Sequence, residues 1–170
     1  PGISEKVQGF WSLWRIALQT TDGREQRFVP IFVTDAGQVL APSARAVWDR
    51  LVEQSEGVRL LPDAVIADDD ARQAFDRCRA AAEEQGRAVF QELTQRHAER
   101  IAQERRKMAV AFAARRRSIE RLGLPQVRDF RLGQLQQEET AWKQGLAERE
   151  AGLPDLTPLL LVAIVGEGTT

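Results

Sequence analysis

The sequence predicts an α+β fold, in which a small antiparallel β-sheet base carries a long antiparallel helical-hairpin, or coiled-coil, arm. Three observations indicate this fold. Two apolar segments flank an Asp-Gly turn near the N-terminus, as in a β-hairpin. No proline occurs from Asp68 until Pro125, which allows a very long helix. A continuous apolar segment near the C-terminus then supplies a further strand for the same sheet.

The first strand is predicted over residues 9–20, because both of its alternating rows are apolar and both faces of such a strand are covered. The rows are Phe10, Trp14, Ile16 and Leu18, and Trp11, Leu13 and Ala17. A second strand follows over residues 27–34, in which Pro30 lacks an N–H group and so indicates an edge strand, a bulge or an unpaired donor position. A short strand is expected over residues 38–40.

A helix is expected over residues 42–54, closed by Gly57, because its apolar residues recur at helical spacing. Residues 58–67 read as a packed connector with one short helix. Tryptophan is expected to pack in the core rather than to bind a ligand; this applies to Trp11, Trp14 and Trp48, while Trp142 is expected in the seam of the arm.

The long helix is expected over residues 69–122, with Asp68-Asp69-Asp70 capping its start and Gly123 its end. At 1.5 Å per residue it would be roughly 80 Å long, so it should project from the base. A return helix is expected over residues 126–151, with its seam formed by Val127, Phe130, Leu135, Trp142 and Leu146. It can cover the outgoing helix only from about His97 onward, so the section before His97 should pack on the base.

The last predicted strand, residues 159–165, is placed most simply at the centre of the sheet. The chain then forms one accessory domain, residues 1–170, with residues 7–67 and 153–168 in the base and residues 68–152 in the arm. Because the chain begins Pro-Gly without an initiator methionine, we expect a fragment of a longer protein.

The charge distribution is strongly uneven, although the net charge is only -1. Residues 96–131 contain eleven basic and four acidic side chains, a local charge of +7. Arginine pairs bidentately with phosphate or carboxylate, so this segment suits a nucleic-acid backbone or an acidic partner. The candidate binding residues are Arg105, Arg106, Lys107, Arg115, Arg116, Arg117, Arg121, Arg128 and Arg131. The competing interpretation is an ordinary solvated coiled-coil face, and the lack of aromatics interleaved on an exposed face argues against base stacking.

The residues that could carry chemistry are few. The lone His97 is expected in the seam or on the surface, Cys78 as a buried inert thiol, and residues 68–70 as a helix cap rather than a cation site. No phosphate-binding loop or dinucleotide fingerprint occurs, so we expect no catalytic residue, metal or cofactor in this chain. The longest apolar run, residues 159–165, is too short to span a bilayer.

Four segments resemble the C-terminal region of bacterial SWI/SNF-type (superfamily 2) helicase-like ATPases, the group that includes the RapA/HepA proteins. They are residues 28–32, 43–51, 115–139 and 156–165. The resemblance implies a cytoplasmic parent protein that hydrolyses ATP, with Mg²⁺, on two upstream RecA-like lobes and acts on double-stranded nucleic acid. No catalytic motif of the family falls on this chain. It would therefore be a non-catalytic accessory domain.

Three functions remain open at this point. The hairpin could contact duplex DNA or an acidic partner; it could dock on the parent ATPase lobes or on RNA polymerase without touching nucleic acid; or the section from Phe75 to Leu93 could form a homodimer. An independent enzyme is the weakest alternative, because nothing pairs a nucleophile with a base.

Overall fold

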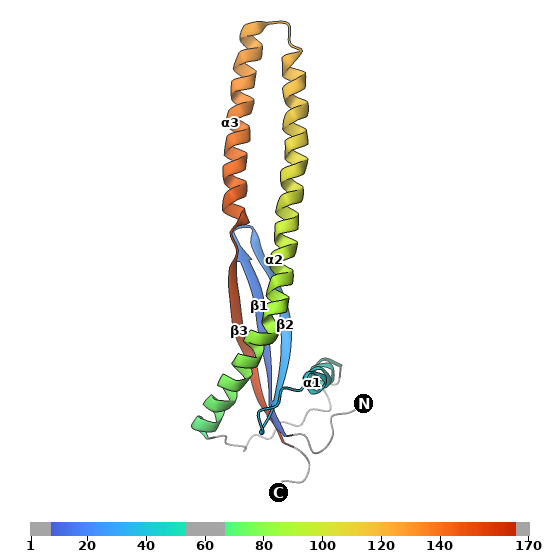
Figure 1. Ribbon diagram of the computed structural model, residues 1–170, viewed down its shortest axis with the longest axis vertical. Coiled ribbons are helices and arrows are strands. Elements are labelled where there is room, and N and C mark those ends of the chain that lie inside the picture. The colour runs from blue at the N-terminus through green and yellow to red at the C-terminus, as the bar shows by residue number, and fades with distance from the viewer. Residues whose placement is uncertain (1–7, 54–66, 166–170) are drawn as a thin grey trace. The chain divides into compact units, whose positions relative to one another are not determined.

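The computed structural model describes residues 8–53 and 67–165. Its elements are β1 (Gly9–Thr20), β2 (Gly23–Thr34), α1 (Ala41–Glu53), α2 (Asp68–Glu120), α3 (Pro125–Glu150) and β3 (Leu153–Ile164) (Figure 1). The three strands form one antiparallel sheet, which confirms the predicted α+β class. The expected helix closure at Gly57 and nearly all of the expected connector lie outside the described residues.

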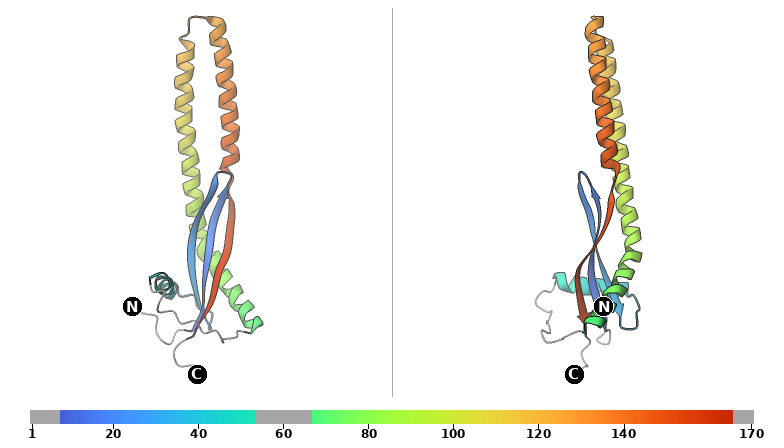
Figure 2. Two further views of the ribbon diagram at one scale, coloured as in Figure 1. Left: turned by 180° about the vertical axis from the view of Figure 1, so that it is seen from behind. Right: turned by 90° about the vertical axis from the view of Figure 1, so that its left-hand side faces the viewer.

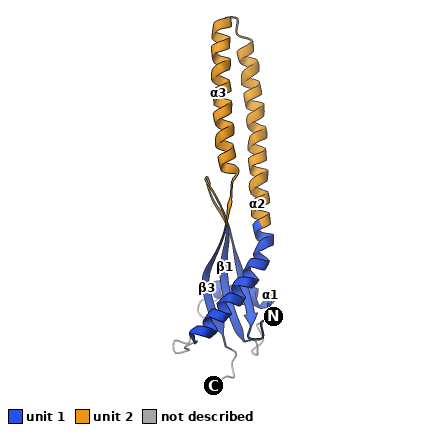
Figure 3. Cartoon of the chain, turned by 60° about the vertical axis from the view of Figure 1, so that its left-hand side comes forward, with its two compact units in different colours: residues 1–17, 26–90, 155–170 blue, residues 18–25, 91–154 orange. Residues whose placement is uncertain are grey.

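The chain divides into two compact units (Figure 3). Unit 1 comprises residues 1–17, 26–90 and 155–170, and unit 2 comprises residues 18–25 and 91–154. Unit 1 thus holds most of the sheet, α1 and the first part of α2. Unit 2 holds the β1–β2 turn, the rest of α2 and all of α3.

The strand order is β2-β1-β3, so β1 is the central strand (Figure 2). Pro30 therefore lies on an edge strand, as predicted. The prediction that the C-terminal strand is central is wrong. β3 is the other edge, and it contains Pro154 and Pro158, which have no N–H group to give to a second neighbour.

β3 also begins six residues earlier than predicted, at Leu153 rather than at residue 159. Asp155 and Thr157 interrupt the apolar pattern there, and their polar side chains meet Arg15 of the central strand. An Arg15 Nη2 donates to Thr157 Oγ1 at 3.0 Å and lies 3.7 Å from an Asp155 carboxylate oxygen. These contacts join β1 to β3 within unit 1.

Unit 1 has a hydrophobic cluster on each face of the sheet. The cluster on one face joins the sheet to α2, and its buried residues are Trp14, Ile31, Val33, Cys78, Ala81 and Ala82. The cluster on the other face joins the sheet to α1, and its buried residues are Trp11, Phe32, Ala44 and Val47. The predicted core tryptophans and the packing of early α2 on the sheet are therefore confirmed. The two buried indole nitrogens are satisfied as well, since Trp11 Nε1 donates to the Ala44 carbonyl and Trp14 Nε1 to Ser12 Oγ.

In unit 2, α2 and α3 pack as an antiparallel pair (Figure 1). The buried seam residues are Leu93, His97, Ile101 and Phe112 on α2 and Leu135 and Leu146 on α3. Trp142 lies in the seam as predicted, with its ring centroid 6.0 Å from that of Phe112. The prediction of Val127 and Phe130 as seam residues is wrong, because both side chains are exposed.

The helix ends follow local sequence signals with one exception. The three aspartates occupy the first turn of α2, as predicted, and Pro125 opens α3. Gly123 does not form the expected left-handed cap, because positive φ is found among the described glycines only at Gly9, Gly23 and Gly37. The expected strand over residues 38–40 reduces to a single bridge between Val33 and Val39.

Candidate binding surface of the helical hairpin

All nine predicted binding residues lie in unit 2. Six are on α2, two are on α3, and Arg121 lies in the connection between the helices. The structure therefore places the basic residues of α2 and those of α3 in the same unit, although residues 121–124 separate the two helices in the sequence. It also shows which of these basic groups are already neutralised by the chain itself.

Four of the nine residues, all arginines, form ion pairs. The pairs are Arg105–Glu150 at 3.2 Å, Arg115–Glu138 at 2.6 Å, Arg116–Glu139 at 2.7 Å and Arg128–Asp129 at 3.7 Å. In the first three, the acid comes from α3 beyond residue 131. The charge of residues 96–131 therefore overstates the charge of the folded hairpin, because α3 brings its own carboxylates alongside α2.

Glu139 illustrates how strongly these acids are held in their ionised form. Its carboxylate lies 2.7 Å from both Lys143 Nζ and an Arg116 nitrogen. The hydrogen bond from Lys143, followed by the interactions with Arg116, lowers the pKa of Glu139 below its ordinary value of 4.5. Arg116 is thus occupied by a partner on the opposite helix.

The other five basic side chains are exposed and make no ion pair within residues 8–53 and 67–165. They are Arg106, Lys107, Arg117, Arg121 and Arg131. Arg106 and Arg117 are eleven residues apart, close to three helical turns, so they lie on one face of α2. Val110 falls between them on the same face and is 68% exposed. This outer face of α2 points away from the seam residues Ile101 and Phe112.

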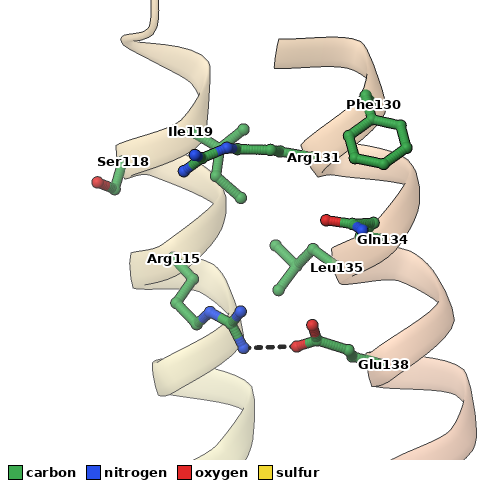
Figure 4. A pocket seen from close by; sticks show the side chains of 8 residues that line it. All are labelled: Arg115, Ser118, Ile119, Phe130, Arg131, Gln134, Leu135 and Glu138. Atoms are coloured by element: carbon green, nitrogen blue, oxygen red, sulfur yellow. Dashed lines mark hydrogen bonds and ion pairs between the residues drawn. The ribbon is translucent and has the colours of Figure 1, made fainter. Parts of the chain in front are cut away.

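A cavity of about 390 Å³ opens between the helices near their connection (Figure 4). Its lining residues are Arg115, Ser118, Ile119, Phe130, Arg131, Gln134, Leu135 and Glu138. Arg115 and Glu138 span it through their ion pair, whereas Arg131 extends from α3 toward α2. The cavity therefore offers one uncommitted guanidinium beside the hydroxyl of Ser118 and the amide of Gln134.

Phe130, like Val127, lies outside the seam for which the sequence predicts it. Its side chain is 66% exposed and lies on the outer side of α3 in Figure 4. Arg131, the next residue, extends toward α2 instead, so Phe130 and this arginine point to different sides of α3. The heptad pattern of α3 explains why Phe130 lies outside the seam. Leu135 and Leu146 are buried, and continuing their heptad toward the N-terminus places seam positions at residues 132 and 128 rather than at residue 130.

His97 is buried in the seam, one of the two places expected for it. Arg100 Nη2 donates to its Nδ1 at 3.0 Å, and its Nε2 lies 3.0 Å from the carbonyl oxygen of Arg149. A guanidinium can only donate, so the hydrogen bonds assign the proton to Nε2 and make the ring neutral. Nε2 therefore joins α2 to α3, whereas Nδ1 is engaged by Arg100 of the same helix.

Arg149 strengthens the same part of the seam. Its guanidinium binds both carboxylate oxygens of Glu104, at 2.7 and 3.3 Å, and lies 3.5 Å from Asp22 in the β1–β2 turn. The hydrogen bond with Glu104 is the main cause that raises the pKa of Arg149. Arg100 also reaches this turn, through Glu25 at 3.0 Å. These contacts give unit 2 a polar junction at the open end of the hairpin.

Cys78 is fully buried among Trp14, Ala81 and Ala82. Burial raises the pKa of its thiol, which disfavours the reactive thiolate. The environment of Cys78 is therefore that of a core residue. This is the position predicted for it.

Within residues 8–53 and 67–165, no three His, Cys, Asp or Glu side chains are grouped so that they could hold a metal ion. No helix in the described ranges is both long enough and apolar enough to cross a membrane. No family model, curated protein or solved structure matches this chain.

Proposed function

We propose that this chain is a non-catalytic accessory domain of a cytoplasmic, SWI/SNF-type helicase-like ATPase, and that its helical hairpin contacts the backbone of nucleic acid. The family assignment comes from the resemblance of residues 28–32, 43–51, 115–139 and 156–165. ATP and Mg²⁺ belong, in this proposal, to the motor lobes of the parent protein. The chain's own contribution is a cationic surface that holds the motor's substrate.

The observation that carries the nucleic-acid contact is the set of five exposed basic side chains of the hairpin that make no ion pair with any residue the structure describes. Neighbouring arginines of the same type are neutralised across the seam, so the unpaired ones are not needed to hold the helices together. Leaving like charges close together costs free energy unless an anion compensates them. A polyanion would supply negative charges that compensate these positive ones, so this surface suits a polyanion.

The spacing on α2 suits a repeating row of phosphates. At 1.5 Å per residue, Arg106 and Arg117 are about 16 Å apart along the axis of α2, and Arg121 follows in the connection just after the helix. Contacts of this kind go to the phosphates and carry no sequence information. Binding should therefore depend strongly on salt and little on base sequence.

The test is fluorescence anisotropy of the 170-residue chain with labelled duplex DNA at low salt. The variant Arg106→Gln/Arg117→Gln/Arg121→Gln removes three unpaired charges from the hairpin. Its control, Arg50→Gln/Arg72→Gln/Arg87→Gln, removes three exposed arginines of unit 1 that have no ion pair among the described residues. We expect the first variant to lose most of its affinity and the control to keep it. Equal losses would show that only net charge matters and would reject the hairpin as the site.

Substituting Arg115, Arg116 and Arg117 together by glutamate would be a less specific test. Arg115 and Arg116 pair with Glu138 and Glu139 on α3. Reversing their charge would set two like-charged pairs across the seam. A fall in affinity could then result from a damaged hairpin rather than from a missing phosphate contact.

Part of the surface suggested for the homodimer is covered within the chain itself. Within the section from Phe75 to Leu93, the apolar side chains of Cys78, Ala81 and Ala82 are buried against the sheet of unit 1. Leu93 is buried within unit 2. A second copy would have to displace these contacts in order to pack there.

A further inference from the structure

Three apolar side chains are exposed together at the closed end of the hairpin. Leu124, in the connection, is 69% exposed, and Val127 and Phe130, in the first turns of α3, are 40% and 66% exposed. Val127 and Phe130 are three residues apart on one helix and so share a face. Contiguous exposed apolar groups of this kind are typical of binding surfaces.

The hairpin does not need these side chains for its own stability. Its seam is filled by Leu135, Leu146, Phe112 and Trp142, and Phe130 lies outside that heptad. An exposed phenylalanine therefore contributes little to folding in this position. Its exposure is explained better by a partner that covers it.

The polar groups beside this apolar cluster are suited to an anion. Arg131 follows Phe130 directly, enters the 390 Å³ cavity and makes no ion pair among the described residues. Glu138 is the acid in the cavity lining, and Arg115 holds it at 2.6 Å. An incoming carboxylate would thus meet the free guanidinium of Arg131 and the hydroxyl of Ser118, with the nearest acid already neutralised.

Nucleic acid fits this cluster less well than protein does. Phosphates could pair with Arg131, but a backbone contact leaves Leu124 and Val127 in water. Strands that bind by stacking use a series of aromatic platforms, whereas Phe130 is the one exposed aromatic side chain among the described residues of unit 2. Aromatic residues and arginine together, with aliphatic neighbours, are the composition of protein–protein hot spots.

We propose that the closed end of the hairpin is a docking site for an acidic protein segment that carries a large apolar side chain. The apolar side chain packs on Phe130, Val127 and Leu124, and a neighbouring carboxylate pairs with Arg131 in the cavity. This site lies on α3 and in the connection, whereas Arg106 and Arg117 of the proposed DNA-contacting face lie on the outer face of α2. It stands whether or not that face binds DNA.

The experiment is a titration of the whole 170-residue chain with three fluorescein-labelled probes. The first is a short peptide pool of Asp, Glu, Leu and Phe, the second is the same pool with Asn and Gln in place of the acids, and the third is single-stranded oligo(dT). We expect the acidic pool to bind, and Phe130→Ala and Arg131→Gln each to weaken it about tenfold, as truncated hot spots do. Val110→Ala removes an equally exposed side chain from the outer face of α2 and should leave peptide affinity unchanged.

Four results would overturn the proposal. They are binding of neither peptide pool, equal binding of the neutral pool, binding only of oligo(dT) with dependence on Phe130, and equal weakening by Val110→Ala. Thermal melts of the variants should match the parent chain, because the substituted side chains are exposed. The variant Arg106→Gln/Arg117→Gln, both on the outer face of α2, should keep its peptide affinity, which separates failure of this site from failure of DNA binding.

Discussion

Phe130 and Leu135 lie five residues apart on α3, and the sequence predicts both for the seam, but the structure exposes the first and buries the second. Leu135→Ala should therefore destabilise the chain by about 2–5 kcal/mol, the cost of a cavity in a packed core. Phe130→Ala should change the free energy of unfolding by only about 0.5 kcal/mol. Urea denaturation followed by circular dichroism measures both. Similar losses would place Phe130 back in the seam.

Glu139 gives a prediction for acid stability. Its pKa is lowered in the folded chain by Lys143 and Arg116, so its contribution is complete above the ordinary value of 4.5 and is lost as the pH falls below that value toward the lowered pKa. Glu139→Gln should flatten the fall of the melting temperature between neutral pH and acid. The control is Glu148→Gln, at an exposed position without an ion pair in the described ranges, and it should leave that slope unchanged. A fall as steep as in the parent chain would show that Glu139 does not contribute.

At the scale of the element, α3 contains two interior glycines whose replacement should stabilise it. A Cβ added to Gly133 or Gly145 meets nothing within 4 Å, whereas one added to Gly86 of α2 lies 2.7 Å from Ile16 Cδ1. Gly133→Ala and Gly145→Ala should each add up to about 1 kcal/mol, the difference in helix propensity. Gly86→Ala should gain less, because Ile16 has to move. Thermal melts of the three variants test this, and a larger gain at Gly86 would contradict the packing of α2 on the sheet.

Helix existence and approximate bounds could be predicted from the sequence because local signals set them. The aspartates at residues 68–70 and Pro125 mark helix starts whatever the tertiary context. The face of α3 that meets α2 is not local information. Val127 and Phe130 carry the right residue types near the right spacing, but the buried heptad through Leu135 excludes them.

The ion pairs of the hairpin likewise depend on how two elements are aligned. Glu138, Glu139 and Glu150 lie more than twenty residues away in sequence from the arginines that they neutralise. The sequence could show that residues 96–131 are basic. It could not show which arginines keep their charge available, because that requires the register of α3 against α2.

At the scale of the whole molecule, the sequence indicates that both ends of the chain join one sheet, and this is confirmed. The strand order was not predictable from the apolar run near the C-terminus, because an edge strand can be as apolar as a central one when helices cover the sheet. The informative residues are Pro154 and Pro158, which cannot donate to a second neighbour. The two apolar rows of β1 also agree with a central position for this strand, because each row packs into the hydrophobic cluster on one face of the sheet.

The overall charge of -1 conceals the feature that we propose to be functional, namely five basic side chains of the hairpin that make no ion pair within the described residues. The salt dependence of duplex DNA binding tests this claim most directly. The logarithm of the binding constant should fall linearly with the logarithm of salt concentration, and Arg106→Gln/Arg117→Gln/Arg121→Gln should make that slope shallower by about 2.7, or about 0.9 for each phosphate that the variant no longer neutralises. An unchanged slope in this variant, or no binding at low salt, would contradict the account.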